Sequence, residues 1–585
     1  MTTTDHKIAL YDCEVDNSVP KQLNETMQSS DTRNGIEPKT STMVTVDSEQ
    51  GQVTQKKSSQ GRRVARKLRP NRIFTHLAAW ILVTTWWVVG LVYHRNDMNW
   101  VEPLLLWLLV SIRIITLHIP AGLVLVPVHF VWSRGVTRME SLIPQTYRTI
   151  TGTIIVAVAL LLGVFIPDET PYNLRSDRAV SMFGYVVFLA GLYATSRNRK
   201  AVVWRPVIVG VLAQFIVGFL VLQTELGKTI FKFLADALTT LLVFAYDGVV
   251  FLTEADITTF GWFIVNSLSV FVFFVALVQM AYYVGLIQWA VPKIAYVFGW
   301  AFGISGAEAL AAATTPFLGM GEAAIVIKGF VPLLTQAEIH QVMTSGFATI
   351  SGSLMVVYIG LGASGQAVIS SCVMSIPISI VISKIRVPET EDPLTRGNIS
   401  IPNLETDDGN EETNILHAMA NGAWIGLKVA GMVMANLLVI IAVVALLDGI
   451  LHWTFKYIQA PNITISKIFG YIFYPVAFLM GVPRSELYLV GQLIGMKTIQ
   501  NEFVAFAALT GEPQFQALSQ RSNIIATYAV CGFANIGSIG IQLGIYGSLS
   551  QVRRGDFARS AVSACICGAL ATFMSASLAG MIFTG

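Results

Sequence analysis

The 585-residue sequence predicts an all-α polytopic membrane protein, built as an inverted repeat with two re-entrant helical hairpins. Three observations predict this fold class. Hydrophobic residues make up 54% of the chain and charged residues 13%, with a mean hydropathy of +0.60, whereas soluble domains carry about one-quarter charged residues. Two apolar regions are broken into pieces too short to span a bilayer. A similar small-residue motif follows each broken region.

Residues 1–72 are predicted to form a disordered cytoplasmic tail, because they are polar, show no sustained period and carry no cleavable signal. Eight basic residues and no acid lie between Lys56 and Arg72, directly before the first apolar segment. This position favours an anchor on anionic membrane lipid over the alternative of nucleic-acid binding. We therefore expect a lipid contact and no nucleic-acid partner.

Residues 73–200 are predicted to form extra N-terminal membrane spans, and residues 201–585 are predicted to form the core of the protein. Apolar segments lie at about 74–93, 101–133, 150–166, 180–195, 205–224, 259–285, 363–385 and 424–450. Basic loops at 134–149 and 196–205 alternate with loops of mixed charge, which fits the positive-inside rule with a cytoplasmic N-terminus. The amphipathic stretch 229–255 is predicted to lie along the membrane surface.

The two broken regions predict re-entrant hairpins. Between Val297 and Phe330, "PFLGMG" leaves apolar pieces of about a dozen residues, which cover only ~18 Å of a ~30 Å hydrocarbon core. The region 466–505 is broken at Pro475 and Pro483. Two half-helices that meet near the midplane satisfy the backbone in both cases.

A helix beginning with a shared motif follows each hairpin: "GFATISGSL" at Gly346–Leu354 and "GFANIGSIG" at Gly532–Gly540. The repeated halves cover about 290–385 and 466–584. An odd number of crossings between the hairpins gives the halves opposite orientations and places the C-terminus outside the cell. Inverted repeats with broken helices are typical of alternating-access carriers.

Four buried polar residues predict a binding site. Glu322 and Glu502 are costly at hydrocarbon depth unless they face a cavity, although helix N-termini at the hairpin tips could also satisfy them. Asn535 and Ser538 lie three apart on one predicted helical face, where helix–helix packing is the alternative role. Together these groups suit a neutral, polyhydroxylated solute. The sequence has no phosphate loop, HExxH motif or nucleophile elbow, so we expect no enzyme, catalytic residue or bound metal.

The remaining acids and cysteines predict structural roles. Glu308 lies within the first hairpin, where it can cap or pair, and Glu338 and Glu486 lie near predicted helix ends. Four cysteines in apolar segments are predicted to pack without a disulfide framework: Cys372, Cys531, Cys565 and Cys567.

At these motifs the chain resembles the concentrative nucleoside transporter family, over about two-thirds of its length. The matching segments are Trp204–Gly227, "YYVGLIQW", "GMGEA", "TSGFATISGSL", "PETEDP", "GQLIGMKTIQNEFVA" and "RSNIIATYAVCGFANIGSIGI". The resemblance implies a homotrimer. The cell membrane is the expected location, because Ile582–Gly585 shows no retention signal. Each protomer would move a nucleoside with Na⁺ or H⁺ by an elevator-like motion of the hairpin domain, and 201–585 would be the transporter core. The extra N-terminal spans are similar to those of the eukaryotic branch.

The resemblance also implies two groups of substrate-binding residues. Those expected at the nucleobase are Gly319, Met320, Gly321, Glu322 and Leu354. Those expected around the ribose are Glu502, Asn535 and Ser538, with Phe533 lining the pocket. A membrane receptor that binds nucleosides without moving them is the alternative from a different functional class.

Departures from the family pattern predict the substrate preference and the coupling ion. Met320 and Gly321 replace a glutamine and a threonine, which favours purine nucleosides, whereas Ser353 and Leu354 follow the pyrimidine-type pattern. Thr315 replaces an asparagine ligand of Na⁺-coupled relatives. The remaining sodium-site positions are Leu318, Thr349 and Ile350. We therefore expect H⁺ coupling with Glu322 as proton carrier, and broad Na⁺-coupled transport is the alternative.

Overall fold

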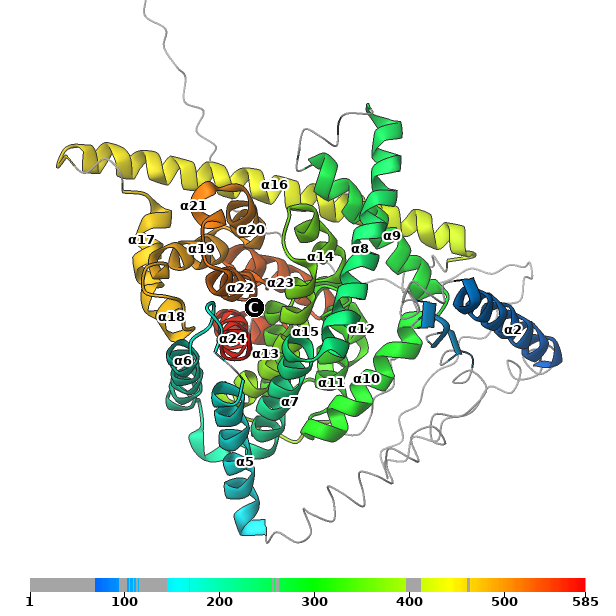
Figure 1. Ribbon diagram of the computed structural model, residues 1–585, viewed down its shortest axis with the longest axis horizontal. Coiled ribbons are helices and arrows are strands. Elements are labelled where there is room, and N and C mark those ends of the chain that lie inside the picture. Colours follow the sequence, from blue (N-terminus) through cyan, green and yellow to red (C-terminus); the bar gives the residue numbers. More distant parts are fainter. Residues whose placement is uncertain are drawn as a thin grey trace, which may run out of the picture. The chain divides into compact units, whose positions relative to one another are not determined.

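The computed structural model describes residues 69–93, 145–167, 169–254, 264–395, 412–459 and 463–583, with isolated positions at 103–114, 257 and 262. This described part is helical and contains no β-strand (Figure 1). It forms two units: Met1–Tyr93 includes helix α2 (Arg69–Tyr93), and His94–Gly585 includes every later helix. Most of the predicted tail and of segment 101–133 lies outside the described residues.

Long apolar helices confirm the polytopic membrane class. Seven described segments are long and apolar enough to cross a membrane, or up to eight when a bent pair counts as one span. The segment at 225–252, which contains the predicted surface stretch, is one of the seven by length and composition.

The helices before the first hairpin flank the core. They are α5 (Gln145–Phe165), α6 (Arg175–Ala194), α7 (Trp204–Gln223), α8 (Glu225–Leu252), a π-helical turn (Ile264–Leu268), α9 (Ser269–Tyr283) and α10 (Leu286–Phe302). Helices α9 and α10 are bent by 80° at Gly285, whose φ of 80° lies in the left-handed region. The predicted span 259–285 therefore ends at an elbow.

Two runs of helices repeat the same order, as the inverted-repeat prediction requires. The first comprises α11 (Gly306–Thr314), α12 (Met320–Val326), a 3₁₀ segment (Lys328–Leu333), α13 (Gln336–Ala348), α14 (Gly352–Gly360) and α15 (Gly365–Arg386). The second comprises α19 (Leu487–Ile499), α20 (Glu502–Gly511), α21 (Pro513–Gln516), α22 (Gln520–Val530), α23 (Ile536–Leu549) and α24 (Arg554–Ile582). Each run is a short hairpin, an interrupted helix and a long helix.

The segments between the repeats are α16 (Ile415–Lys456), α17 (Ile465–Ile472) and α18 (Tyr474–Leu479). Helix α16 has 42 residues, much longer than the predicted span 424–450, and it packs along α9 (Figure 1). Pro475 lies in the first turn of α18 and Pro483 separates α18 from α19. The prediction that the second hairpin is broken at Pro475 and Pro483 is therefore wrong, because its turn is at Gln500–Asn501, between α19 and α20.

The prediction that a helix begins with each shared motif is wrong, because Gly-Phe-Ala ends α13 in the first repeat and lies between α22 and α23 in the second. Helix α13 ends at Ala348 and α14 starts after Ser351, whose Oγ accepts a hydrogen bond from Leu354 N at 3.3 Å. Helix α23 starts after Asn535, whose Oδ1 accepts from Ser538 N at 2.7 Å. Short polar side chains at these positions cap a new helix in place of continuing the old one.

The two interruptions meet in the core, where α24 packs on both α13 and α22 (Figure 1). Gly532 has a φ of 155°, a conformation that L-residues rarely adopt. A side chain there would lie 2.8 Å from Thr572 Cγ2 and 3.1 Å from the Phe347 carbonyl oxygen. The contact therefore requires glycine.

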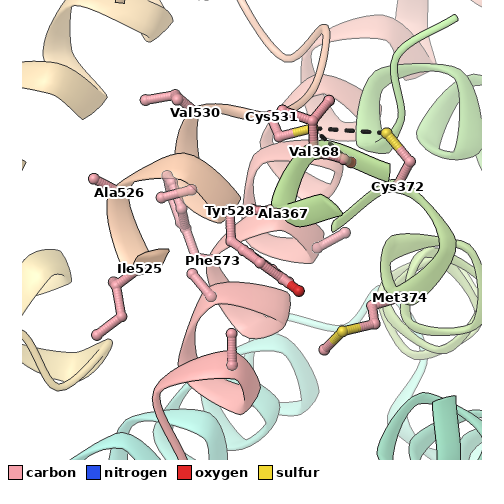
Figure 2. Close-up of a cluster of buried hydrophobic side chains, with 14 of the residues drawn as sticks. Ala367, Val368, Cys372, Met374, Ile525, Ala526, Tyr528, Val530, Cys531 and Phe573 are labelled. Carbon is pink, nitrogen blue, oxygen red and sulfur yellow. Dashed lines mark hydrogen bonds between the residues drawn. The ribbon is translucent and has the colours of Figure 1, made fainter. Parts of the chain in front are cut away.

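Cysteines pack beside this junction. Figure 2 shows Cys531, at the end of α22, facing Cys372 of α15, with 3.6 Å between the sulfur atoms. Both thiols are buried and free, and Cys531 Sγ also lies 3.7 Å from the Val368 carbonyl oxygen. The pair fills the core between the two repeats.

We expect Gly532→Ala to destabilise the protein by about 2 kcal/mol or more, because the new methyl group meets fixed atoms in a disfavoured backbone conformation. The measurement is the melting temperature of the detergent-solubilised protein. Gly540→Ala in α23 is the matched control, since nothing lies within 4 Å of its added methyl group. Equal melting temperatures for the two variants would contradict the packing described here.

Candidate functional site

A buried carboxylate lies where the two repeats meet. Glu502 begins α20 at the tip of the second hairpin and is 3% exposed. Its Oε2 accepts a hydrogen bond from Asn535 Nδ2 at 2.8 Å, and its Oε1 accepts from the Tyr358 hydroxyl at 3.2 Å. Tyr358 belongs to α14 of the first repeat, so Glu502 joins both repeats.

The local sequence explains why Glu502 is held in this place. Asn501 caps α20 by accepting from Val504 N at 3.0 Å, which fixes Glu502 in the first helical turn, where the helix dipole favours an acid. Tyr358 is fully buried and stacks on Phe506, with ring centroids 4.7 Å apart. A carboxylate can accept about four hydrogen bonds, so capacity remains on Glu502 for further donors.

The structure brings three of the predicted polar residues together. Asn535 caps α23 and bonds both Glu502 and the Ser538 backbone, as described above. Ser538 is buried in the first turn of α23. Phe533 is buried in the interruption that precedes Asn535. The predicted proximity of Asn535 and Ser538 therefore arises from a helix cap and not from one continuous helical face.

The first hairpin presents its predicted residues toward α23. Helix α12 contains Met320 and Gly321 and packs against α23. A side chain on Gly321 would lie 3.2 Å from Ile545 Cδ1. The side chain of Glu322, also in α12, lies outside the part of the chain that the structure describes. Leu354 is buried in α14, the helix that also carries Tyr358.

A buried lysine near the site escaped the sequence prediction. Lys497 lies on α19, five residues before Glu502, and is fully buried. Its Nζ donates to the Ala529 carbonyl at 2.7 Å and to Thr572 Oγ1 at 2.9 Å. The cation thus neutralises the C-terminal end of α22 and ties the second hairpin to α24. The sequence could have indicated it, because a lysine at the end of the apolar stretch "GQLIGMK" is costly to bury and so points to a specific role.

The predicted cation positions lie at the first hairpin tip and at the first interruption. Thr315 follows α11 and is 2% exposed, and its Oγ1 has no hydrogen-bond partner among the described residues. Thr349 is buried in the interruption, and its hydroxyl donates to the Ser345 carbonyl at 3.0 Å. Gly352 N donates to the Phe317 carbonyl at 3.2 Å and joins the two segments. Leu318 and Ile350, the other two positions, are buried in the same segments.

The acids predicted to have structural roles have them. Glu308 forms a capping box with Ser305 and pairs with Lys384, whose Nζ is 2.5 Å from Glu308 Oε1. Glu338 forms a capping box with Thr335. Glu486 accepts from Ser519 N at 3.0 Å, at the start of α22. No group of three or more His, Cys, Asp or Glu residues in the described ranges could hold a metal ion.

Family models match most of the second unit. The Na⁺ dependent nucleoside transporter C-terminus matches residues 367–580, the corresponding N-terminus matches 183–256, and a nucleoside recognition (Gate) model matches 264–365.

Relatives and solved structures agree with these models. Sodium/nucleoside cotransporter 2 of Rattus norvegicus is 34% identical over 70% of this chain and 63% of its own length. Sodium/nucleoside cotransporter 1 of Mus musculus is 34% identical over 73% of this chain and 67% of its own length. The structure of CNTnw in an inward-facing substrate-bound state has a TM-score of 0.64 and 31% identity, over 69% of this chain and 97% of that one. An outward-facing CNTnw structure has a TM-score of 0.66 and 31% identity, over 70% and 99%.

These findings define the class as a helical, polytopic membrane protein with two hairpin-containing repeats. Within that class, the chain belongs to the concentrative nucleoside transporter family, whose members are transporters and not enzymes. The chain spans 59% to 63% of the length of the first curated relatives that it matches.

We expect Tyr358→Phe to lower the stability of the folded protein by about 1.5–3 kcal/mol, because Glu502 loses a donor to a charged oxygen. In a Glu502→Gln background the same substitution should cost clearly less, since the acceptor is then neutral. A double-mutant cycle on melting temperatures measures this coupling. Equal losses in the two backgrounds would show that the hydroxyl does not act through Glu502.

Proposed function

We propose that this protein is a sodium-coupled nucleoside symporter that works by alternating access. The observation that carries the proposal is the Glu502, Asn535 and Tyr358 cluster at the second hairpin tip, in a chain of this family. Several curated relatives are described as sodium/nucleoside cotransporters.

The chemistry of the cluster supports a ribose subsite. Glu502 has acceptor capacity left after bonding Asn535 and Tyr358, and adjacent hydroxyls on a sugar are suitable donors. An analogue without those hydroxyls would leave a buried carboxylate short of partners, which strongly disfavours its binding. Phe533 and Ser538 would complete the subsite beside the cap of α23.

Sodium is better supported than the proton that the sequence predicted. Several relatives are named as sodium/nucleoside cotransporters, and the buried Thr315 hydroxyl oxygen has no hydrogen-bond partner among the described residues. A hard cation prefers several oxygen ligands, and the Thr349 oxygen and the backbone carbonyls of Leu318 and Ile350 could supply others. Proton coupling through Glu322 is the second candidate, because Thr315 stands where an amide is expected.

Several finer features of the proposal rest on the family resemblance. They are a preference for purine nucleosides through Met320 and Gly321, a homotrimer and elevator-like motion of the hairpin domain. A cell-membrane location with a cytoplasmic N-terminus and an extracellular C-terminus rests instead on the charges of the loops and the number of crossings. The half-buried Met320 side chain would contact the base with its polarizable thioether, which supports the purine preference. The basic segment before α2 would contact anionic lipid.

The purified protein in liposomes should accumulate labelled adenosine when a Na⁺ gradient is imposed, and a pH gradient alone should give no accumulation. The measurement is the ratio of internal to external nucleoside. Accumulation driven only by the pH gradient would show that the coupling ion is a proton and not sodium. Saturable binding without accumulation under either gradient would indicate a receptor.

Paired threonine variants provide the internal control for this experiment. Thr315→Val should raise the Na⁺ concentration for half-maximal uptake by about tenfold, because a candidate ligand oxygen is lost. Thr314→Val should leave it unchanged, since Thr314 is not one of the predicted cation positions and its hydroxyl donates back to the Leu310 carbonyl of α11 at 2.6 Å. An unchanged Na⁺ dependence in Thr315→Val would remove Thr315 from the cation site.

A further inference from the structure

Gln542 is a buried amide that neither the sequence prediction nor the family resemblance singled out. It lies on α23, four residues after Ser538, so the two side chains share one helical face a single turn apart. Its side chain is fully buried among helices α12, α13 and α23. A long polar side chain in such a place requires hydrogen-bond partners.

Only half of this amide is satisfied. Gln542 Nε2 donates to the Met343 carbonyl of α13 at 3.3 Å, which fixes the orientation of the amide plane. Gln542 Oε1 is buried and has no hydrogen-bond partner among the described residues. An unpaired buried acceptor lowers stability until a donor reaches it.

The amide lies beside the first hairpin. A side chain on Gly346 would be 2.5 Å from Gln542 Nε2 and 3.2 Å from Met320 Cβ, so Gln542 and Met320 flank the same glycine. Ile545, three residues after Gln542, approaches Gly321 in the same way. Gln542 thus lies near Met320, the hairpin position where the family motif would carry an amide, and about one helical turn before the residue that approaches Gly321.

The spacing along α23 suits a nucleoside. Gln542 lies seven positions after Asn535, which bonds Glu502, and seven steps along an α-helix rise ~10.5 Å. This length is comparable with a nucleoside measured from its ribose hydroxyls to the outer edge of its base. One helix can therefore contact both ends of the substrate.

We propose that Gln542 is a specificity-determining residue whose side-chain carbonyl accepts a hydrogen bond from a donor on the nucleobase. Gln542 on α23 thereby supplies a side-chain amide in place of the glutamine of the family motif, whose position in the first hairpin is taken by Met320. The proposal rests on nucleoside binding at the Glu502 cluster. Bases with an exocyclic amino group or a ring N–H satisfy Gln542, and a base without either group leaves the oxygen unpaired.

Adenosine and purine riboside test this proposal, because they differ only in the 6-amino group. In liposomes with a Na⁺ or a pH gradient, the wild-type protein should transport adenosine with a kcat/KM about tenfold or more above that of purine riboside. Gln542→Met should bring the two values together. Gln341→Met is the matched control, since Gln341 is also buried with an unpaired Oε1 but bonds Ser345 of its own helix, and it should keep the preference.

The outcomes separate this inference from the proposed function. Transport of neither nucleoside by the wild-type protein defeats the proposed function itself. Equal transport of the two by the wild type, or a preference retained in Gln542→Met, overturns the role of Gln542 while nucleoside transport stands. If Gln542→Met does not fold, the thermal stabilisation of wild-type protein by each ligand decides, and equal stabilisation overturns the role.

Discussion

The hydrogen bonds that hold the Glu502 carboxylate between Asn535 and Tyr358 are the interaction on which the rest of the site depends. A buried carboxylate is stable only with hydrogen-bond donors on several sides. One donor comes from the interruption in the second repeat and the other from the second half-helix of the first repeat. The Glu502 site therefore forms only when both repeats are folded and packed together.

Interrupted helices make this arrangement possible. Ser351 and Asn535 cap new helices inside the apolar core, so that backbone groups and polar side chains become available there. Gly532 lets the two interruptions approach closely. Lys497 neutralises the C-terminal end of α22, the helix that precedes the second interruption. The polar site is thus a consequence of where helices stop, and the long helices α15 and α24 pack around those ends.

Local pattern predicted the hairpins, the repeat and the acid at the second tip, because segment length and the shared motif depend on nearby residues alone. The same patterns did not predict contacts between residues that are far apart in the sequence. Tyr358 lies 144 positions from Glu502, and Lys497 meets Thr572 across 75 positions, so no local spacing could indicate either contact. The interruptions were missed for another reason. Asn535 is acceptable both as the N-cap of a new helix and as a residue on the polar face of a helix, and the local sequence does not distinguish these two roles.

The most direct measurement compares transport of adenosine and 2′,3′-dideoxyadenosine by the wild-type protein and by Glu502→Gln in liposomes. If Glu502 binds the ribose hydroxyls, the dideoxy compound should have a kcat/KM about a hundredfold lower in the wild type, and Glu502→Gln should largely erase that difference. Equal transport of the two nucleosides by the wild-type protein would contradict the account.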